Sequence, residues 1–386
     1  MNMKMVQGNK KKKKFFVHDM LATLREEEVP LYYNPRHVKK TLVEKHTERP
    51  VFDRWITDTP EIISQMFNHD KNKWNLKNVC ATAHEYSRIS ELVVTNYSLL
   101  TDVYHYLQSK SDRYPWVSFY TARKHFFMDA LVQGYGVKNT IFDLSIKAAD
   151  YNRGDSSSVV HDGVLRRYQF IEWVILLSKQ IFMQHDEEIC RDSAVDEKYT
   201  GLDLLKQTQL FLNTTLRKFV DNKVIEWQDF REDRLWVPDV RLLYTMNEGH
   251  LRKMYSQYAA KGRGLGTKPF NCDYMELADC VQLFCKDTNV GLHKDVIKYA
   301  FVMSKMTVVE ETNPDAVDTY GKLLYVEFLE VIARVAEQYF LGSEMEELDL
   351  NLKIEFLLDE MLPAVGETRV KQEAIIAEFS ESDDDY

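Results

Sequence analysis

The sequence is poor in the residues that interrupt helices and poor in cysteine. Its 386 residues include 14 glycines and 9 prolines, whereas average usage would give roughly 27 and 19. So few chain breakers argue against many short strands and hairpins and in favour of long helices. The five cysteines form no CxxC pair, and an odd, scattered set is typical of reduced thiols rather than of a disulfide framework.

Long apolar runs are also missing, and positive charge is in the minority. No apolar run reaches the roughly 18 residues that a membrane-spanning helix needs, and the charged N-terminus lacks the apolar core of a secretion signal. The 50 basic and 60 acidic residues leave a net charge of −10. Because phosphate binding needs clustered positive charge, this balance disfavours a nucleic-acid-binding protein. We therefore expect a cytoplasmic protein with neither a transmembrane segment nor a nucleic-acid partner.

Apolar residues recur with a period close to 3.6, which predicts amphipathic helices. One apolar stripe consists of Leu202, Leu205, Leu212, Leu216 and Phe219, and another of Leu324, Phe328, Val331, Ile332 and Val335. Asn139 and Thr140 before an apolar run predict a helix start. We read Glu91–Val94 as helix because its neighbours are helical. The predicted fold class is all-α, with disordered, charged ends.

A stretch in the middle of the chain returns 158 residues later. Residues 163–182 align without a gap with residues 321–340, and six of the twenty positions are identical. Further upstream, Asn96, Leu100 and Tyr104 match Asn247, Leu251 and Tyr255 at an offset of 151. The offset changes from 151 to 158 residues, which indicates loops of different length in the two copies. The alternative is chance similarity between two amphipathic helices. Duplication predicts two helical modules, over 90–222 and 241–367. We expect a linker over 223–240 between them and an extended or helical segment over 17–89 before them.

The repeated block resembles the second half of an EF-hand. In that family a glycine at loop position 6 makes a sharp turn, position 8 is apolar, and a glutamate at position 12 binds calcium through both oxygens. These positions are held by Gly163, Leu165 and Gln169 in the first copy and by Gly321, Leu323 and Glu327 in the second. The resemblance implies two EF-hand-like modules of the kind found in scaffold proteins of cilia and the cytoskeleton.

Most calcium ligands of this resemblance are missing. In the second copy, loop positions 1, 3 and 5 are Ala316, Asp318 and Tyr320, and in the first copy Gln169 replaces the bidentate glutamate. Calcium needs six or more oxygen ligands, so we expect neither a metal ion nor another cofactor. Asp318 and Glu327 are the remnant of a metal site, and they keep open the alternative of a calcium-responsive regulatory protein.

Signatures of catalysis are absent from the sequence as well. There is no Gly-x-Ser-x-Gly elbow, and the glycine-rich run over 261–268 lacks the spacing of a phosphate loop. Cys272, Cys280 and Cys285 lack the spacing of a zinc knuckle. We therefore predict a non-enzymatic adaptor or scaffold subunit without catalytic residues, and keep an enzyme of another type as a second alternative.

The two ends of the chain carry opposite charge. The tail over 368–386 is acidic, whereas the basic arm over 1–16 holds the candidate partner-binding residues Lys10, Lys11, Lys12, Lys13, Lys14, Phe15 and Phe16. Each lysine contributes about 1 kcal/mol near an anionic surface, and a single arm is a poor membrane anchor. We expect an acidic protein polymer as the partner, such as tubulin or the axonemal proteins of a cilium or flagellum. Plain solubility is the alternative role of the arm.

Overall fold

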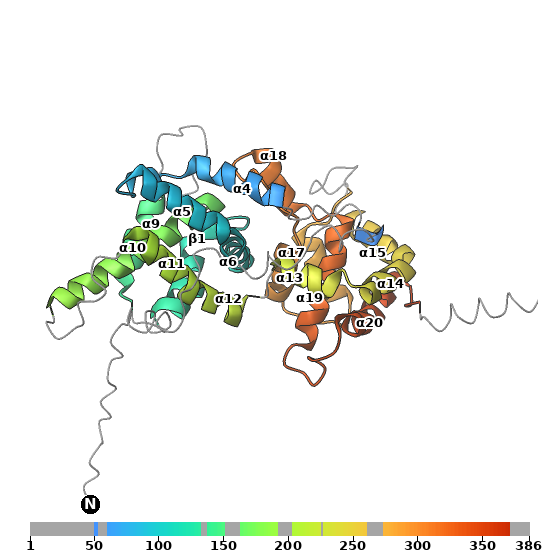
Figure 1. Cartoon of the computed structure of the whole chain (residues 1–386). Coiled ribbons are helices and arrows are strands. Elements are labelled where there is room, and N and C mark those ends of the chain that lie inside the picture. Colours follow the sequence, from blue (N-terminus) through green and yellow to red (C-terminus); the bar gives the residue numbers. More distant parts are fainter. Residues whose placement is uncertain are drawn as a thin grey trace, which may run out of the picture. The chain divides into compact units, whose positions relative to one another are not determined.

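The computed structural model describes residues 50–52, 60–132, 137–150, 163–191, 203–224, 227–260 and 273–370. Within these ranges the regular structure is almost entirely helical, with one pair of two-residue strands and one isolated bridge (Figure 1). The predicted all-α class is therefore confirmed. None of the described helices combines the length and the apolar character needed to cross a bilayer.

The described chain divides into two compact units. Unit 1 comprises the described residues of 73–103 and 117–224, and unit 2 those of 35–72, 104–116 and 225–370. The predicted boundaries need correction in two places. Residues 104–116 group with unit 2 rather than with a module over 90–222. The segment 223–240 is not a linker, because its apolar side chains Phe230 and Leu235 are buried in the core of unit 2.

Unit 1 begins with the 3-10 turn η2 (Leu76–Asn78), α5 (Ala83–Thr95) and the first half of α6 (Tyr97–Lys110). It continues with β1 (Val117–Ser118), α7 (Phe119–Ala122), the π-helical η3 (Arg123–Val132), α9 (Asn139–Asp150), β2 (Val164–Leu165) and α10 (Arg167–Arg191). It ends with α11 (Leu204–Phe211), the π-helical η5 (Leu212–Leu216) and α12 (Arg217–Lys223). Helices α5 and α9 confirm the helix predicted over Glu91–Val94 and the helix start predicted at Asn139.

An aromatic cluster holds α9 and α10 together. The Trp173 ring lies edge-on to Phe126 and Phe142, with ring centroids 5.8 and 5.7 Å apart. Its indole N–H donates to Ser145 Oγ over 3.0 Å. Such edge-to-face pairs add about 0.5–1.5 kcal/mol each beyond the area that they bury. The aromatic residues that are abundant in the sequence thus form a packed core in this unit.

Unit 2 contains the 3-10 turn η1 (Pro50–Phe52), α4 (Pro60–Lys73, assigned to this unit up to Asn72), α13 (Trp227–Phe230), the π-helical η6 (Arg231–Leu235) and α14 (Pro238–Met246). It continues with α15 (Glu248–Ala260), α16 (Leu277–Gln282), the π-helical η7 (Leu283–Asp287) and α17 (Lys294–Met303). Its last elements are α18 (Pro314–Asp318), the 3-10 turn η8 (Thr319–Gly321), α19 (Tyr325–Phe340), α20 (Leu350–Met361) and the 3-10 turn η9 (Leu362–Val365).

Helix α19 is the centre of unit 2. Of its 16 residues, 13 are buried, and it packs against α17 and α20. Phe328 has no exposed surface, and its ring centroid lies 5.7 Å from that of Tyr255. Leu324, which the apolar stripe predicted to be buried, is exposed because it is the N-cap residue before the helix. A helix buried along most of its length also buries charged residues, and these form the site described below.

The two units have corresponding elements in the same order. In each unit a single asparagine separates two helices, Asn96 between α5 and α6 and Asn247 between α14 and α15. Both asparagines donate from Nδ2 to the carbonyl oxygen four residues earlier over 2.9 Å. The offset between them, 151 residues, is the one found in the sequence comparison.

A short antiparallel pairing joins two connecting segments within each unit. Val117 pairs with Leu165 in unit 1, and Met275 pairs with Leu323 in unit 2. In unit 2 the two backbone hydrogen bonds of the bridge measure 3.0 and 2.8 Å. Both members of the second pair follow those of the first by 158 residues, so the aligned segments occupy corresponding places in the two units.

Candidate functional site

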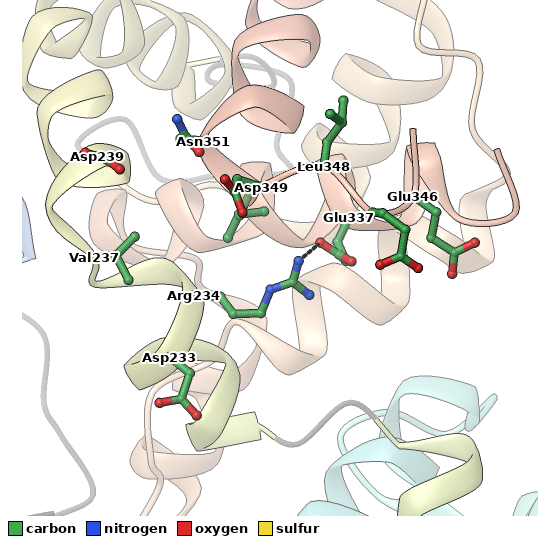
Figure 2. Close-up of a pocket in the computed structure, with 11 residues that line it drawn as sticks. Asp233, Arg234, Val237, Asp239, Glu337, Glu346, Leu348, Asp349 and Asn351 are labelled. Carbon is green, nitrogen blue, oxygen red and sulfur yellow. Dashed lines mark hydrogen bonds and ion pairs between the residues drawn. The ribbon is translucent and has the colours of Figure 1, made fainter. Parts of the chain in front are cut away.

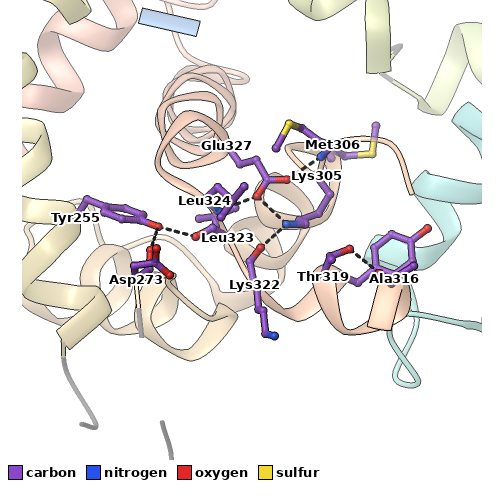
Figure 3. Close-up of polar contacts among 12 residues, drawn as sticks. Tyr255, Asp273, Lys305, Met306, Ala316, Thr319, Lys322, Leu323, Leu324 and Glu327 are labelled. Carbon is purple, nitrogen blue, oxygen red and sulfur yellow. Dashed lines mark hydrogen bonds and ion pairs between the residues drawn. The ribbon is translucent and has the colours of Figure 1, made fainter. Parts of the chain in front are cut away.

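The segment between α17 and α19 encloses a buried ion pair (Figure 3). The Lys305 ammonium donates to Glu327 Oε2 over 2.7 Å and to the Lys322 carbonyl oxygen over 2.5 Å. Lys305 is only 4% exposed and Glu327 only 1%. The cation is therefore held by one carboxylate and one backbone carbonyl, away from solvent.

Local backbone structure places both partners. Lys305 comes directly after the end of α17, whereas Glu327 is the third residue of α19. Glu327 Oε2 also accepts from the Leu324 N–H over 2.8 Å, which is the back-reaching half of a capping box. Glu327 Oε1 accepts from the Met306 N–H over 2.8 Å. Both carboxylate oxygens are thus satisfied by groups of this loop.

Burial and charge act on the lysine in opposite directions. Burial lowers the pKa of the Lys305 ammonium, and the neighbouring Glu327 carboxylate opposes this shift. In unit 1 the residue aligned with Glu327 is Gln169, whose Oε1 accepts from the Arg166 N–H over 3.0 Å. A neutral amide needs no counter-ion, whereas a buried carboxylate does. The lysine therefore accompanies the copy of the loop that carries the charge.

Asp318, the other residue of the predicted metal remnant, lies at the surface. Its side chain is 62% exposed and forms an ion pair with Lys322 Nζ four residues further on. Across the described residues, no group of three or more metal-ligating side chains comes together. The structure thus brings Glu327 to a lysine and leaves Asp318 in a surface pair.

A second buried charge cluster lies further along α19. Glu330 accepts from Arg231 Nε over 2.8 Å and from Arg334 Nε over 2.7 Å. Arg231 also donates to the carbonyl oxygens of Met303 and Lys305 over 3.4 and 3.0 Å. It therefore ties the segment after α17 to α19 from a second side. Sequence reasoning missed this cluster, because Arg231 stands 99 residues before Glu330 and no spacing rule links them.

An acidic cavity of about 590 Å³ opens beside α14 and the start of α20 (Figure 2). Its acidic lining residues are Asp233, Asp239, Glu337, Glu346, Glu347 and Asp349. Arg234, the basic residue of the lining, donates to Glu337 Oε2 over 2.7 Å. Several carboxylates around one paired guanidinium give this cavity a negative potential, which attracts cationic groups.

Two of the free thiols are poorly suited to nucleophilic catalysis. Burial raises the pKa of the Cys80 thiol to about 11, and it raises the pKa of Cys285 above its ordinary value. The thiolate is the reactive form of cysteine, so raised pKa values make these side chains inert near neutral pH.

Comparison with known proteins finds no matching family, no matching curated protein and no matching solved structure. The site can therefore be interpreted only from its own geometry. The candidate partner-binding residues Lys10, Lys11, Lys12, Lys13, Lys14, Phe15 and Phe16 lie outside the described residues.

Proposed function

We propose that the chain is a non-enzymatic helical adaptor, built from two degenerate EF-hand-like modules that work without a metal ion. The observation that carries this proposal is the position of Lys305. Its ammonium lies between the Lys322 carbonyl and the Glu327 carboxylate. These two residues align with loop positions 7 and 12, which offer calcium a carbonyl oxygen and a bidentate carboxylate in an EF-hand. A cation supplied by the chain itself makes an added ion unnecessary.

The paired segments support the same proposal. In both units the bridged residue, Leu165 or Leu323, follows the aligned glycine by two positions and precedes a long helix. Gly163 has a φ of 90°, as a sharp turn requires, whereas Gly321 ends the 3-10 turn η8 without a positive φ. Two helix–loop–helix elements joined through their loops would explain why both members of the bridged pair recur at the same offset of 158 residues.

For the partner we propose an acidic protein polymer of the cytoskeleton, such as a microtubule of a ciliary axoneme, and hence a cytoplasmic location. The support is the sequence of the arm, in which Phe15 and Phe16 follow five consecutive lysines, Lys10–Lys14. Such a segment combines positive charge with an apolar anchor, and acidic protein tails offer a complementary surface.

Calcium titration tests the proposal that the two modules work without a bound metal ion. We expect no binding heat in the micromolar range, because Glu327 is already buried against Lys305 and Asp318 lies at the surface, paired with Lys322. A calcium-binding EF-hand protein in the same buffer serves as the positive control. Micromolar heat that disappears in Glu327→Gln would instead favour the alternative, a calcium-responsive regulatory protein.

Sedimentation with microtubules tests the proposed partner. Replacing Lys10–Lys14 by glutamine should weaken binding at least ~10-fold, since each lysine contributes about 1 kcal/mol near an anionic surface. The matched control replaces five exposed lysines outside the arm by glutamine: Lys124, Lys147, Lys218, Lys223 and Lys286. An equal loss in both variants would show that net charge, rather than the arm, governs binding.

A further inference from the structure

Helix α20 and the end of α19 present large apolar side chains to solvent. Phe356 is 47% exposed, Leu352 38% and Tyr339 37%. The ring centroid of Phe340 lies 4.9 Å from that of Tyr339 and 6.0 Å from that of Phe356. Leu352 stands one helical turn before Phe356 on the same side of α20. The exposed side chains of Tyr339, Leu352 and Phe356, with the buried Phe340 ring between Tyr339 and Phe356, form what we call the α20 apolar face.

Negative charge surrounds the α20 apolar face. Residues 337–367 contain nine acidic residues and one basic residue, Lys353. Lys353 is buried, and its ammonium donates to Glu337 Oε1 over 3.1 Å. Other acidic side chains in this stretch are exposed and form no ion pair with any residue that the structure describes: Glu344, Glu347, Asp349 and Glu360. The acidic cavity of Figure 2 adds to this rim at the start of α20.

We propose that the α20 apolar face and its acidic rim bind a basic amphipathic helix of a partner protein. Exposed contiguous apolar surface marks interaction sites, and the spacing of Leu352 and Phe356 by one turn suits the apolar side of a second helix. Lysine or arginine on the flanks of that helix would face the carboxylates, which directs both association and choice of partner. The inference rests on the proposed adaptor function and names the chemistry of its partner.

Charge also argues against a second copy of this chain as the occupant. A symmetric dimer through this face would bring the same surface of two copies together. It would therefore place two acidic rims against each other, and like charges in contact suppress association.

The probe is a labelled 18-residue helical peptide with leucines on one side and lysines on the other, added to the full chain and followed by fluorescence anisotropy. We expect saturable binding that weakens as salt is raised from 50 to 200 mM, since exposed charge pairs are screened. The double variant L352S/F356S should bind at least ~10-fold more weakly, because it removes two apolar anchors. The control L144S changes a leucine of α9 that is 59% exposed, more than either α20 residue, and it should leave binding unchanged.

Three results would overturn the inference. Equally tight binding of a peptide with glutamates in place of the lysines would remove the charge argument. Unchanged binding by L352S/F356S would show that the α20 apolar face is not the binding site. Affinity that rises when residues 1–16 are deleted would identify the arm of this chain as the occupant instead. Calcium titration and microtubule sedimentation test the proposed adaptor function and do not involve α20. If L352S/F356S behaves in both as the unchanged chain does, a loss of peptide binding concerns the α20 apolar face alone.

Discussion

Replacing Lys305 by methionine should lower the free energy of unfolding of unit 2 by about 3–5 kcal/mol, as expected when one partner of a buried ion pair is removed. Glu327 would remain buried while losing the ammonium that now lies 2.7 Å from its Oε2. Methionine keeps most of the lysine stem, so the effect reports on charge rather than on a cavity. Hydrogen exchange of the α19 amides measures it, because exchange of buried amides reports the free energy of opening.

Two further variants give this experiment its controls. Lys322→Met removes an exposed lysine from its surface pair with Asp318, and such pairs contribute about 0–1 kcal/mol. Adding Glu327→Gln to Lys305→Met removes the orphaned charge and keeps an acceptor for backbone N–H groups, so it should restore part of the lost protection. If Lys305→Met is as harmless as Lys322→Met, the ion pair does not organise this loop.

The helices were predictable because apolar periodicity is a local property of the sequence. Phe328, Val331, Ile332 and Val335 are all buried on α19, as their spacing predicts. Leu324 differs only because the helix begins one residue after it, and periodicity does not say where a helix starts. The boundaries of the units were not predictable, since residues 104–116 group with a segment more than a hundred positions away.

The site was predictable only in part. Glu327 could be singled out from its spacing after Gly321, but its partner Lys305 lies 22 residues earlier and belongs to no motif. Counting loop positions back from Gly321 predicts that Asp318 belongs to the same site as Glu327. Asn313 and Pro314 instead start the short helix α18, with the Asn313 side chain accepting from the Asp315 N–H and proline at the first position. Because α18 forms a helical turn inside the predicted loop, it changes which residues can face Glu327. Counting positions along the sequence does not predict such a turn.

The second large effect is expected from Phe328→Ala, which should destabilise unit 2 by about 3–5 kcal/mol, the usual range for a buried phenylalanine. Phe328 has no exposed surface, and its ring packs against that of Tyr255. Phe356→Ala makes the same chemical change at a residue that is 47% exposed, and it should cost less than about 1 kcal/mol. Hydrogen exchange read separately for α19 and α10 assigns each loss to its unit.

The aligned residue of unit 1 completes the test. Phe170 is also fully buried and lies 5.9 Å from the Trp173 ring, so Phe170→Ala should open α10 and leave α19 protected. If Phe170→Ala lowers amide protection only in α10 and Phe328→Ala only in α19, each aligned phenylalanine supports the core of its own unit. If Phe328→Ala keeps the protection of α19 but weakens partner binding, this residue contributes to a binding groove, and the paired helices of unit 2 then pack without it.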